Sequence, residues 1–285
     1  MHTERFAPSP TGELHLGHAF SALTGWRRAR VAGGQFLVRM EDLDQGRVRS
    51  EFVDQIYEDL TWLGVDWDGE VVFQSARYDA YRSALDRLTA MDLTYSCTCT
   101  RRDIAEAVSA PQEGAVQAGP DGPVYPGTCR DRAVRPGIPA AIRLDIRKAL
   151  DCLGAMALDF EETGSGPHGE TGRIELDRDN LIHGTGDVAL ARRDDAPAYH
   201  LAVVVDDAWQ EITHVTRGRD LFSATPVHRL LQHLLRLSVP VYHHHRLIRD
   251  DAGKRLAKRD HAHSLAALRD AGWQPGDLLR RLGLD

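Results

Sequence analysis

The first 90 residues alternate between strand-like and helix-like stretches, and this alternation restricts the fold more than any other feature. Residues 4–9, ERFAPS, read as a short buried strand, and residues 16–32 have helical composition up to the glycine pair at 33–34. QFLVRMED then alternates like a strand, and SEFVDQIYEDLTWLG and RYDAYRSALDRLTAM follow as helices, the first capped by Ser50. Strands separated by helices of this length predict a parallel sheet with crossovers, hence an α/β fold.

Residues 95–190 interrupt this pattern with two loop-like segments rich in glycine and proline. A buried-strand pattern returns in AYHLAVVVDD, residues 198–207. TPVHRLLQHLLRL then predicts a helix with Thr225 as its cap and Pro226 at its first position, and the tail from Ser264 onward has helical composition. We therefore interpret residues 95–190 as an insertion that splits the α/β domain.

The composition restricts the class of protein. The 285 residues are 42% hydrophobic and 27% charged, so the chain can bury one sizeable core. No apolar run approaches the roughly 20 residues of a membrane span, and residues 1–5 lack a secretory signal pattern, so we expect a cytoplasmic protein without membrane contact. The formal net charge of −7 argues against indiscriminate coating of nucleic acid, although a local basic groove is compatible with it.

The stretch APSPTGELHLGHAF, residues 7–20, joins the first predicted strand to the first predicted helix. A glycine-containing turn at this place binds anions, because backbone N–H groups and the helix dipole point at a phosphate. His15 and His18 face the same way on one helical turn, while Gly17 leaves room for a flat base or a ribose. The pattern indicates a nucleotide held across its phosphates; the alternative is a chance motif whose histidines only cap the turn.

A second motif, RLAKRD at 255–260, follows HHHRLIRDDAG. Together the two motifs resemble the paired signatures of class I aminoacyl-tRNA synthetases, with HLGH in the place of His-Ile-Gly-His and RLAKR in that of Lys-Met-Ser-Lys-Ser. RFAPSPTGELHLGHAFSAL, RMEDLDQGR and TRGRDL are also similar to segments of glutamyl-tRNA synthetases, in the same order. The second signature departs from the family, because Arg255 replaces its first lysine and Ala257 its first serine, which removes one hydroxyl donor.

The resemblance implies a Rossmann-type class I catalytic domain with an inserted zinc-binding subdomain and a short helical C-terminal segment. We expect residues 1–94 to form the first half of the catalytic domain and residues 191–245 its second half. Residues 95–190 would be an inserted subdomain like the acceptor-binding one of the family, and residues 246–285 the signature loop and the C-terminal helices.

Enzymes of this family attack the α-phosphate of ATP with an amino-acid carboxylate and pass the acyl group from the resulting adenylate to an RNA hydroxyl. Catalysis of such a step consists of positioning and of stabilising charge on the phosphates. The resemblance places ATP, accompanied by Mg²⁺, against His15, Gly17, His18 and Lys258. The histidines would donate to the phosphates and Lys258 would hold the departing pyrophosphate; a solvated lysine in a basic run is the alternative for Lys258.

A glutamate site needs a cation for the side-chain carboxylate and acceptors for the ammonium group, and Arg5 and Glu41 suit these needs. By resemblance, the amino-acid pocket is lined by Arg5, Phe6, Ala7, Pro8, Ser9, Glu41, Tyr199 and Arg217. Two alternatives remain open: Arg5 and Glu41 could be a structural pair at strand ends, and Tyr199 could be a core residue.

Four cysteines are too few for a disulfide scaffold in a chain of this length. Cys97, Cys99 and Cys129, with Tyr125, offer three thiolates and a phenolate that could make a closed zinc site and order a loop rich in glycine and proline. Ordinary reduced cysteines are the alternative. Short relatives of glutamyl-tRNA synthetases carry zinc at the four matching positions, so the resemblance implies a structural Zn²⁺ ion. We expect Cys152 in the core.

The chain ends at Asp285, without the anticodon-binding domain of a full glutamyl-tRNA synthetase. The resemblance is therefore to the short branch of the family, whose members activate L-glutamate without tRNA and esterify it to the queuosine base at the first anticodon position of tRNA(Asp). We expect a monomeric ligase with L-glutamate, ATP and queuosine-containing tRNA(Asp) as partners. The alternatives are conventional glutamylation of a tRNA 3′ end, a different nucleotidyltransferase, and a non-catalytic tRNA-binding relative.

An anticodon loop would need basic residues at the mouth of the pocket. Candidates are Arg27, Arg28, Arg30, Arg246, Arg249, Lys254 and Arg259, which could equally be solvated helix faces. The histidine triplet at 243–245 is expected in an exposed turn beside the second signature rather than as a cluster of ligands.

Overall fold

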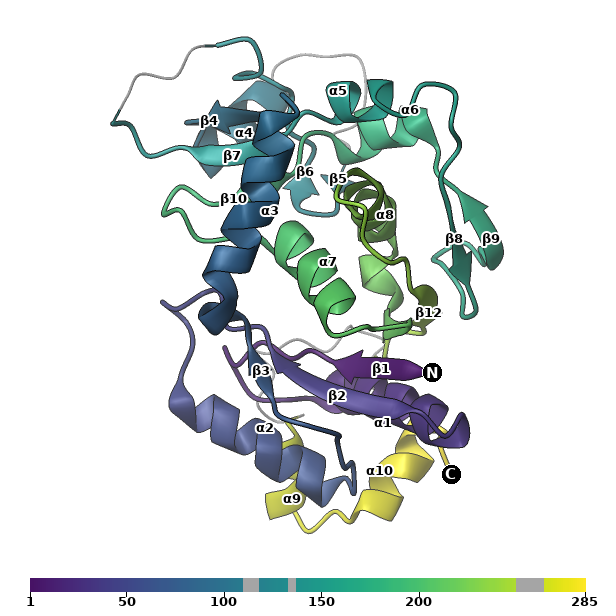
Figure 1. Cartoon of the computed structure of the whole chain (residues 1–285). Coiled ribbons are helices and arrows are strands. Elements are labelled where there is room, and N and C mark those ends of the chain that lie inside the picture. The colour runs from purple at the N-terminus through teal and green to yellow at the C-terminus, as the bar shows by residue number, and fades with distance from the viewer. Residues whose placement is uncertain (110–117, 133–136, 250–263) are drawn as a thin grey trace.

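The structure is a computed structural model that describes residues 1–109, 118–132, 137–249 and 264–285 (Figure 1). Strands and helices alternate along the chain, and the α/β class predicted from the sequence is confirmed. None of the described helices combines the length and the apolar character that crossing a membrane requires.

The N-terminal part is a three-stranded parallel sheet with crossover helices, as predicted. The strands are β1 (Thr3–Phe6), β2 (Gln35–Met40) and β3 (Val72–Phe73); the helices are α1 (Leu16–Val31), α2 (Ser50–Trp62) and α3 (Tyr78–Ala90), the last preceded by the 3₁₀ turn η1 (Gln74–Arg77). Thr3 lies opposite Gln35 and Phe6 opposite Val38 in the parallel register. The predicted cap Ser50 is the first residue inside α2, because the extended residue before the helix is Arg49.

A second sheet continues beside β1. Its order is β11 (His214–Gly218), β12 (Val241–His245), β8 (Asp159–Glu162) and β9 (Gly172–Glu175). The backbone N–H of Thr213 donates to the carbonyl of Thr3, and the buried Glu4 carboxylate accepts from the backbone N–H of Thr216. The carboxyl ends of β1 and β11 therefore open on the same region, where an α/β fold binds its ligands.

The stretch 198–207 is a helix, and its prediction as a strand was wrong. Helix α7 spans Tyr199–Trp209, and seven of its residues are buried. A short apolar run cannot be assigned to a strand or to a buried helix from periodicity alone, and its valines favoured the wrong choice. The next helix, α8 (Thr225–Leu234), follows the 3₁₀ turn η3 (Arg219–Ala224); Ala224 rather than Thr225 is its cap.

The region between α3 and α7 forms the top of the view in Figure 1. Antiparallel β4 (Thr94–Cys97), β7 (Ala141–Leu144) and β10 (Ala189–Ala191) make its sheet, and the small elements are α4 (Arg101–Ser109), β5 (Ala118–Gly119), β6 (Gly122–Pro123), α5 (Ile146–Asp151), α6 (Arg178–Asn180) and the π turn η2 (Leu181–Thr185). Strands β8 and β9 also belong to the range 95–190, yet they join the sheet of β11 and β12.

Two helices at the C-terminal end pack against the N-terminal part, at the bottom of Figure 1. The predicted helical tail is thereby confirmed as α9 (Leu265–Asp270) and α10 (Pro275–Leu282). Leu265 and Leu278 are buried in the same hydrophobic cluster as Leu14 and Phe20. The backbone N–H of Leu265 donates to the carbonyl of Leu14, so the tail is joined to the turn that precedes α1.

Candidate active site

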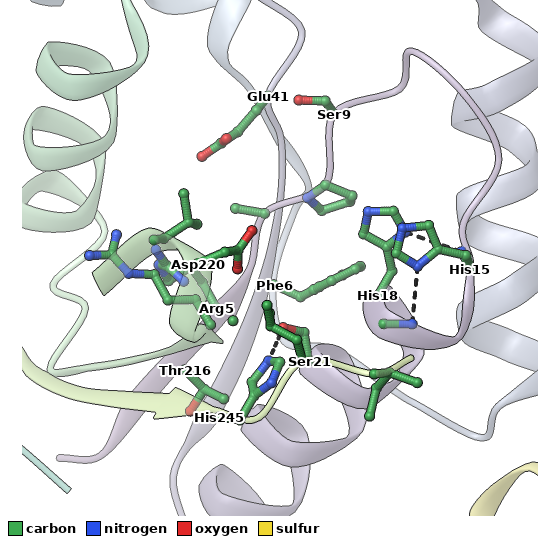
Figure 2. Close-up of a pocket in the computed structure, with 18 of the residues that line it drawn as sticks. Arg5, Phe6, Ser9, His15, His18, Ser21, Glu41, Thr216, Asp220 and His245 are labelled. Atoms are coloured by element: carbon green, nitrogen blue, oxygen red, sulfur yellow. Dashed lines mark hydrogen bonds between the residues drawn. The ribbon is translucent and has the colours of Figure 1, made fainter. Parts of the chain in front are cut away.

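One pocket of about 530 Å³ lies where β1, β11 and β12 end and α1 begins. This volume is typical of a small-molecule site. Eleven of the residues expected from the sequence line it: Arg5, Phe6, Ala7, Pro8, Ser9, His15, Gly17, His18, Glu41, Tyr199 and Arg217. Figure 2 shows the imidazoles of His15 and His18 on one side of this pocket and Arg5 and Asp220 on the other. Lys258 lies outside the described residues.

The two signature histidines cap α1. The Nδ1 atom of His15 accepts from the backbone N–H of Gly17 at 3.0 Å, and Nδ1 of His18 accepts from that of His15 at 3.1 Å. Each neutral ring therefore carries its proton on Nε2, and the two rings stack with their centroids 3.8 Å apart. A Cβ atom at Gly17 would lie 2.9 Å from Cε1 of His15, so a residue with a side chain at position 17 would collide with the His15 ring. The first turn of α1 holds no acidic residue, which leaves its N-terminus attractive to an anion.

Arg5 belongs to a buried ionic cluster that the sequence did not indicate. Its Nε donates to Oδ1 of Asp207 at 3.0 Å, and Nη1 of Arg39 donates to the same oxygen at 2.8 Å. Burial alone would raise the pKa of Asp207, but the two guanidinium groups outweigh it and hold that pKa below its ordinary value. Arg5 is thus fixed at the end of β1, opposite α7. In the sequence, the one signal for this cluster is the acidic pair Asp206 and Asp207 at the end of the apolar run 198–207.

Glu41 and Tyr199 lie at the same end of the pocket as Arg5. Glu41 accepts from Nη2 of Arg39 at 3.3 Å, and among the described residues no hydrogen bond joins it to Arg5, whose charge nevertheless acts on it. Burial raises the pKa of Glu41, and Arg39 and Arg5 offset this only in part. Tyr199 is partly buried and lines the pocket, and burial raises its pKa. A carboxylate beside two arginines can receive an ammonium group while the arginines receive a carboxylate.

Arg217 at the end of β11 is buried among uncharged groups. Its Nε donates to Nε2 of His244 at 3.0 Å, and its Nη2 donates to Oγ1 of Thr225 at 2.8 Å. Its Nη1 lies 3.3 Å from Nδ1 of His228 and donates to the Tyr199 hydroxyl at 3.4 Å. The guanidinium is thereby held in one orientation beside the pocket.

The histidine triplet at 243–245 lies in strand β12, and its prediction as an exposed turn was wrong. His244 and His245 are buried, because β12 lies between β11 and β8. Nε2 of His245 lies 2.6 Å from the Ser21 hydroxyl, and both residues line the pocket. The pocket also includes Asp220, from the segment TRGRDL. Sequence reasoning missed these three residues, since only the fold brings β12, η3 and α1 together.

The three expected cysteines meet in the inserted region. The sulfur atoms of Cys97, Cys99 and Cys129 lie within 4.8 Å of one another, with Cys99 and Cys129 at 3.5 Å. The Tyr125 hydroxyl is 3.3 Å from Sγ of Cys97 and 3.6 Å from that of Cys99. Cys152, predicted in the core, is instead exposed at the end of α5.

This donor set fits a zinc ion. Bonds of about 2.3 Å at tetrahedral angles separate neighbouring sulfur ligands by about 3.8 Å, close to the distances found here. Burial raises the pKa of the Cys129 thiol, but hydrogen bonds with Tyr125 and the backbone of Thr98 outweigh it and lower that pKa to about 7. Burial and hydrogen bonds with the cysteines raise the pKa of Tyr125 far above its ordinary value, so its hydroxyl keeps its proton unless a cation binds; the guanidinium carbon of Arg143 lies 3.9 Å from the centre of its ring.

Several of the basic candidates for an RNA surface are engaged within the protein. Arg28 pairs with Glu4 at 3.1 Å, and Arg30 pairs with Asp68 at 2.8 Å. Arg27 donates to the carbonyl of Leu284, and Arg246 to that of Leu282 at 2.6 Å. These four residues therefore stabilise the packing of the chain, while Lys254 and Arg259 lie outside the described residues.

The comparisons with known proteins agree with the fold. Residues 2–284 match the family described as the catalytic domain of class I tRNA synthetases for E and Q. The chain is 55% identical to a glutamyl-Q tRNA(Asp) synthetase of Rhodobacter capsulatus, over 98% of this chain and 99% of that protein. It is 44% identical to a glutamyl-Q tRNA(Asp) synthetase of Deinococcus radiodurans, over 98% of this chain and 87% of that protein.

Among solved structures, the chain resembles a glutamate-tRNA synthetase of Elizabethkingia anophelis with a TM-score of 0.72 and 25% identity. That match covers 91% of this chain but 53% of the larger enzyme. A synthetase fold thus carries three features of this chain: the histidine turn, the arginine-lined pocket, and the cluster of Cys97, Cys99, Tyr125 and Cys129. The chain therefore belongs to the class I tRNA synthetases for glutamate and glutamine, in their glutamyl-Q tRNA(Asp) synthetase branch, and is a ligase.

Proposed function

We propose that this ligase activates L-glutamate with ATP in the absence of tRNA and transfers it to the queuosine base at the first anticodon position of tRNA(Asp). The observation that carries the proposal is the joint geometry of one pocket. The arginines and Glu41 at one end suit an amino acid with two carboxylates and an ammonium group, while the N-terminus of α1 with its two imidazoles suits phosphates. Similarity over the whole chain to enzymes named for this product supports the same acceptor.

In the first step the α-carboxylate oxygen of glutamate bonds to the α-phosphorus of ATP, and pyrophosphate leaves. Arg5 and Arg217 would bind the substrate's side-chain carboxylate, and Glu41 its ammonium group, with Ser9 and Tyr199 completing the wall. His15 and His18 would donate from Nε2 to the phosphates, and Lys258 would hold the pyrophosphate. Mg²⁺ bound with ATP would neutralise part of the phosphate charge.

In the second step a hydroxyl oxygen of the queuosine cyclopentene-diol attacks the acyl carbon of the adenylate, and AMP leaves as the ester forms. The residues of the chain need only hold the adenylate, exclude water and admit the modified base. Cys97, Cys99, Tyr125 and Cys129 would hold a structural Zn²⁺ ion in the inserted region, away from the reacting atoms.

The proposal is tested by offering radiolabelled glutamate and ATP to tRNA from cells that make queuosine and from cells that do not. Digestion with a guanosine-specific ribonuclease at mildly acidic pH, which preserves the ester, then locates the label. We expect label only in the queuosine-containing pool and only in the anticodon fragment. Label in both pools at the 3′-terminal fragment would establish conventional charging instead.

A second measurement separates activation from transfer. Pyrophosphate exchange into ATP should require glutamate and should proceed without tRNA. Exchange that depends on a different acid would establish another nucleotidyltransferase. Binding of tRNA without any exchange would establish a non-catalytic relative.

A further inference from the structure

Arg217 is a buried cation that touches no carboxylate of the residues that the structure describes. Only 5% of its surface is exposed, and its four hydrogen-bond partners in the described part of the chain are His244, His228, Thr225 and Tyr199. Its guanidinium carbon also lies 5.2 Å from the centre of the Tyr242 ring. A buried charge without a counter-ion is costly, so the surrounding residues must compensate for it in another way. Its neighbour Arg5 differs, since Asp207 pairs with it directly at 3.0 Å.

The first compensation is a hydrogen-bond chain from Arg217 through His244 to the Glu162 carboxylate. Oε1 of Glu162 accepts from two backbone N–H groups, of His244 at 2.9 Å and of Gly164 at 2.7 Å. Its Oε2 then receives the hydrogen on Nδ1 of His244, which leaves Nε2 of that ring as the acceptor for Arg217. Burial lowers the pKa of His244 to about 4, so the ring is neutral at pH 7.

The second compensation is a hydrogen-bond chain from Arg217 through His228 and His200 to the Asp121 carboxylate. Nδ1 of His228 faces Nη1 of Arg217, so the hydrogen of that ring is on Nε2, 3.0 Å from Nδ1 of His200. The hydrogen of His200 is then on Nε2, 3.1 Å from the Asp121 carboxylate. Asp121 lies in the turn between β5 and β6, in the inserted region. In both hydrogen-bond chains each group donates to the next in the same direction, from the arginine through imidazole rings to a carboxylate.

We propose that Glu162 and Asp121 are positioning residues, which act through His244 and through the His228–His200 pair to hold the Arg217 guanidinium ready for a glutamate carboxylate. Each carboxylate fixes a histidine tautomer whose lone pair faces the arginine. Because neither carboxylate touches the guanidinium, the positive charge remains for the ligand to neutralise. This inference rests on the proposed function, since it assumes that glutamate is the substrate.

Glu162→Gln is the sharpest variant, because the amide can satisfy the two backbone N–H groups only with its oxygen. Its NH₂ group must then face Nδ1 of His244, which moves the hydrogen of that ring to Nε2, opposite the N–H of Arg217. Glu161→Gln is the matched control, because the neighbouring side chain on β8 is exposed. Asp121→Ala tests the second hydrogen-bond chain, at an aspartate whose side chain is 56% exposed and therefore tolerant of substitution. Asp131→Ala, at another exposed aspartate, is its control.

The readout is pyrophosphate exchange without tRNA, with glutamate, glutamine and ATP varied in turn. We expect Glu162→Gln to raise the KM for glutamate about tenfold and to reduce the preference for glutamate over glutamine by a similar factor, with the KM for ATP within twofold of wild type. Asp121→Ala should raise the glutamate KM about threefold. If circular dichroism shows that Glu162→Gln does not fold, the glutamate KM of Asp121→Ala becomes the deciding measurement.

An unchanged glutamate KM in the folded variants would overturn the inference, and so would a parallel rise in the KM of both substrates, which a general structural defect produces. Wild-type protein that shows no glutamate-dependent exchange would instead contradict the proposed function itself. The two failures are therefore distinct in the same assay.

Discussion

Two buried polar clusters in this molecule are completed in opposite ways. In the Asp207 cluster, one carboxylate lies between the guanidinium groups of Arg5 and Arg39, so opposite charges within the chain satisfy one another. In the cysteine cluster, Cys97, Cys99, Cys129 and Tyr125 bring together four weak acids of the same kind, which repel one another once ionised. The first cluster pairs its charges within the chain, whereas the donor set of the second suits a cation from outside. Their responses to substitution should therefore differ in kind.

The largest effect is expected at the cysteine cluster. Cys129→Ser removes one of three sulfur donors, and we expect the zinc content, measured by plasma emission spectrometry, to fall from about one ion per chain to near zero. Structural zinc sites contribute about 10–16 kcal/mol of binding free energy in zinc-finger peptides, so the inserted region should also become sensitive to proteolysis. Cys152→Ser should keep both properties, since Cys152 is exposed. Wild-type protein without zinc would contradict the assignment.

The next effect is expected at Asp207. Asp207→Asn leaves two buried guanidinium groups without their shared carboxylate, which should lower the free energy of unfolding by about 3–5 kcal/mol at pH 7. Because the pKa of Asp207 is depressed in the folded state, this stabilisation is present at neutral pH and is lost as the pH falls through that lowered pKa. In urea unfolding of both proteins from pH 7 to pH 3, the difference should therefore begin to narrow below about pH 4, the unfolded pKa of an aspartate; a constant difference would refute the ionic account.

A third site, the buried carboxylate of Asp59, lies between these two cases, since Arg269 is its one cationic partner among the described residues. Oδ1 of Asp59 pairs with Arg269 at 3.1 Å, while its buried Oδ2 has no hydrogen-bond partner among the described residues. Burial raises the pKa of Asp59 to about 7, and Arg269 offsets this only in part. The folded pKa exceeds the unfolded value of about 4, so the stability contributed by this group is full below pH 4 and is lost as the pH rises through 7.

Asp59→Asn should accordingly remove this pH dependence. Relative to wild type, we expect the variant to gain about 1–3 kcal/mol of unfolding free energy on going from pH 5 to pH 8. Thermal or urea unfolding at the two pH values measures the difference. Glu58→Gln, at an exposed neighbour that also meets Arg269, is the control. An identical pH profile in Asp59→Asn and wild type would show that Asp59 titrates normally.

The smallest effect is expected at the surface. Asp194 pairs with Arg192 at 2.8 Å, yet 62% of the Asp194 side chain is exposed. Solvent and salt screen such a pair, so Asp194→Asn should change the free energy of unfolding by less than about 1 kcal/mol. A loss comparable with that of Asp207→Asn would mean that pairing rather than burial decides the stability of these clusters.

Sequence periodicity predicted the N-terminal sheet and its helices because their apolar positions recur with the spacing of strand or helix. It failed at α7, where residues on most sides of the helix are buried and the helical period disappears. The histidine turn could be found because its members are close in sequence and match a known signature, and the cysteines because their pattern matches known zinc positions. Asp207, Glu162 and His228 could not, since each acquires its role from a partner on a distant element.

The hydrophobic cluster around α1 also has a consequence for biosynthesis. Leu14, Leu16 and Phe20, near the N-terminus, share this cluster with residues 265–282, from which they are separated by more than two hundred positions. Such a high contact order slows folding, because distant segments must meet before burial rewards them. On the ribosome, where N-terminal segments emerge first, the strand and helix that carry the signature histidines cannot complete their core until α9 and α10 have been synthesised. The emerging chain therefore exposes an apolar face for most of its translation, and we expect it to bind chaperones during that interval.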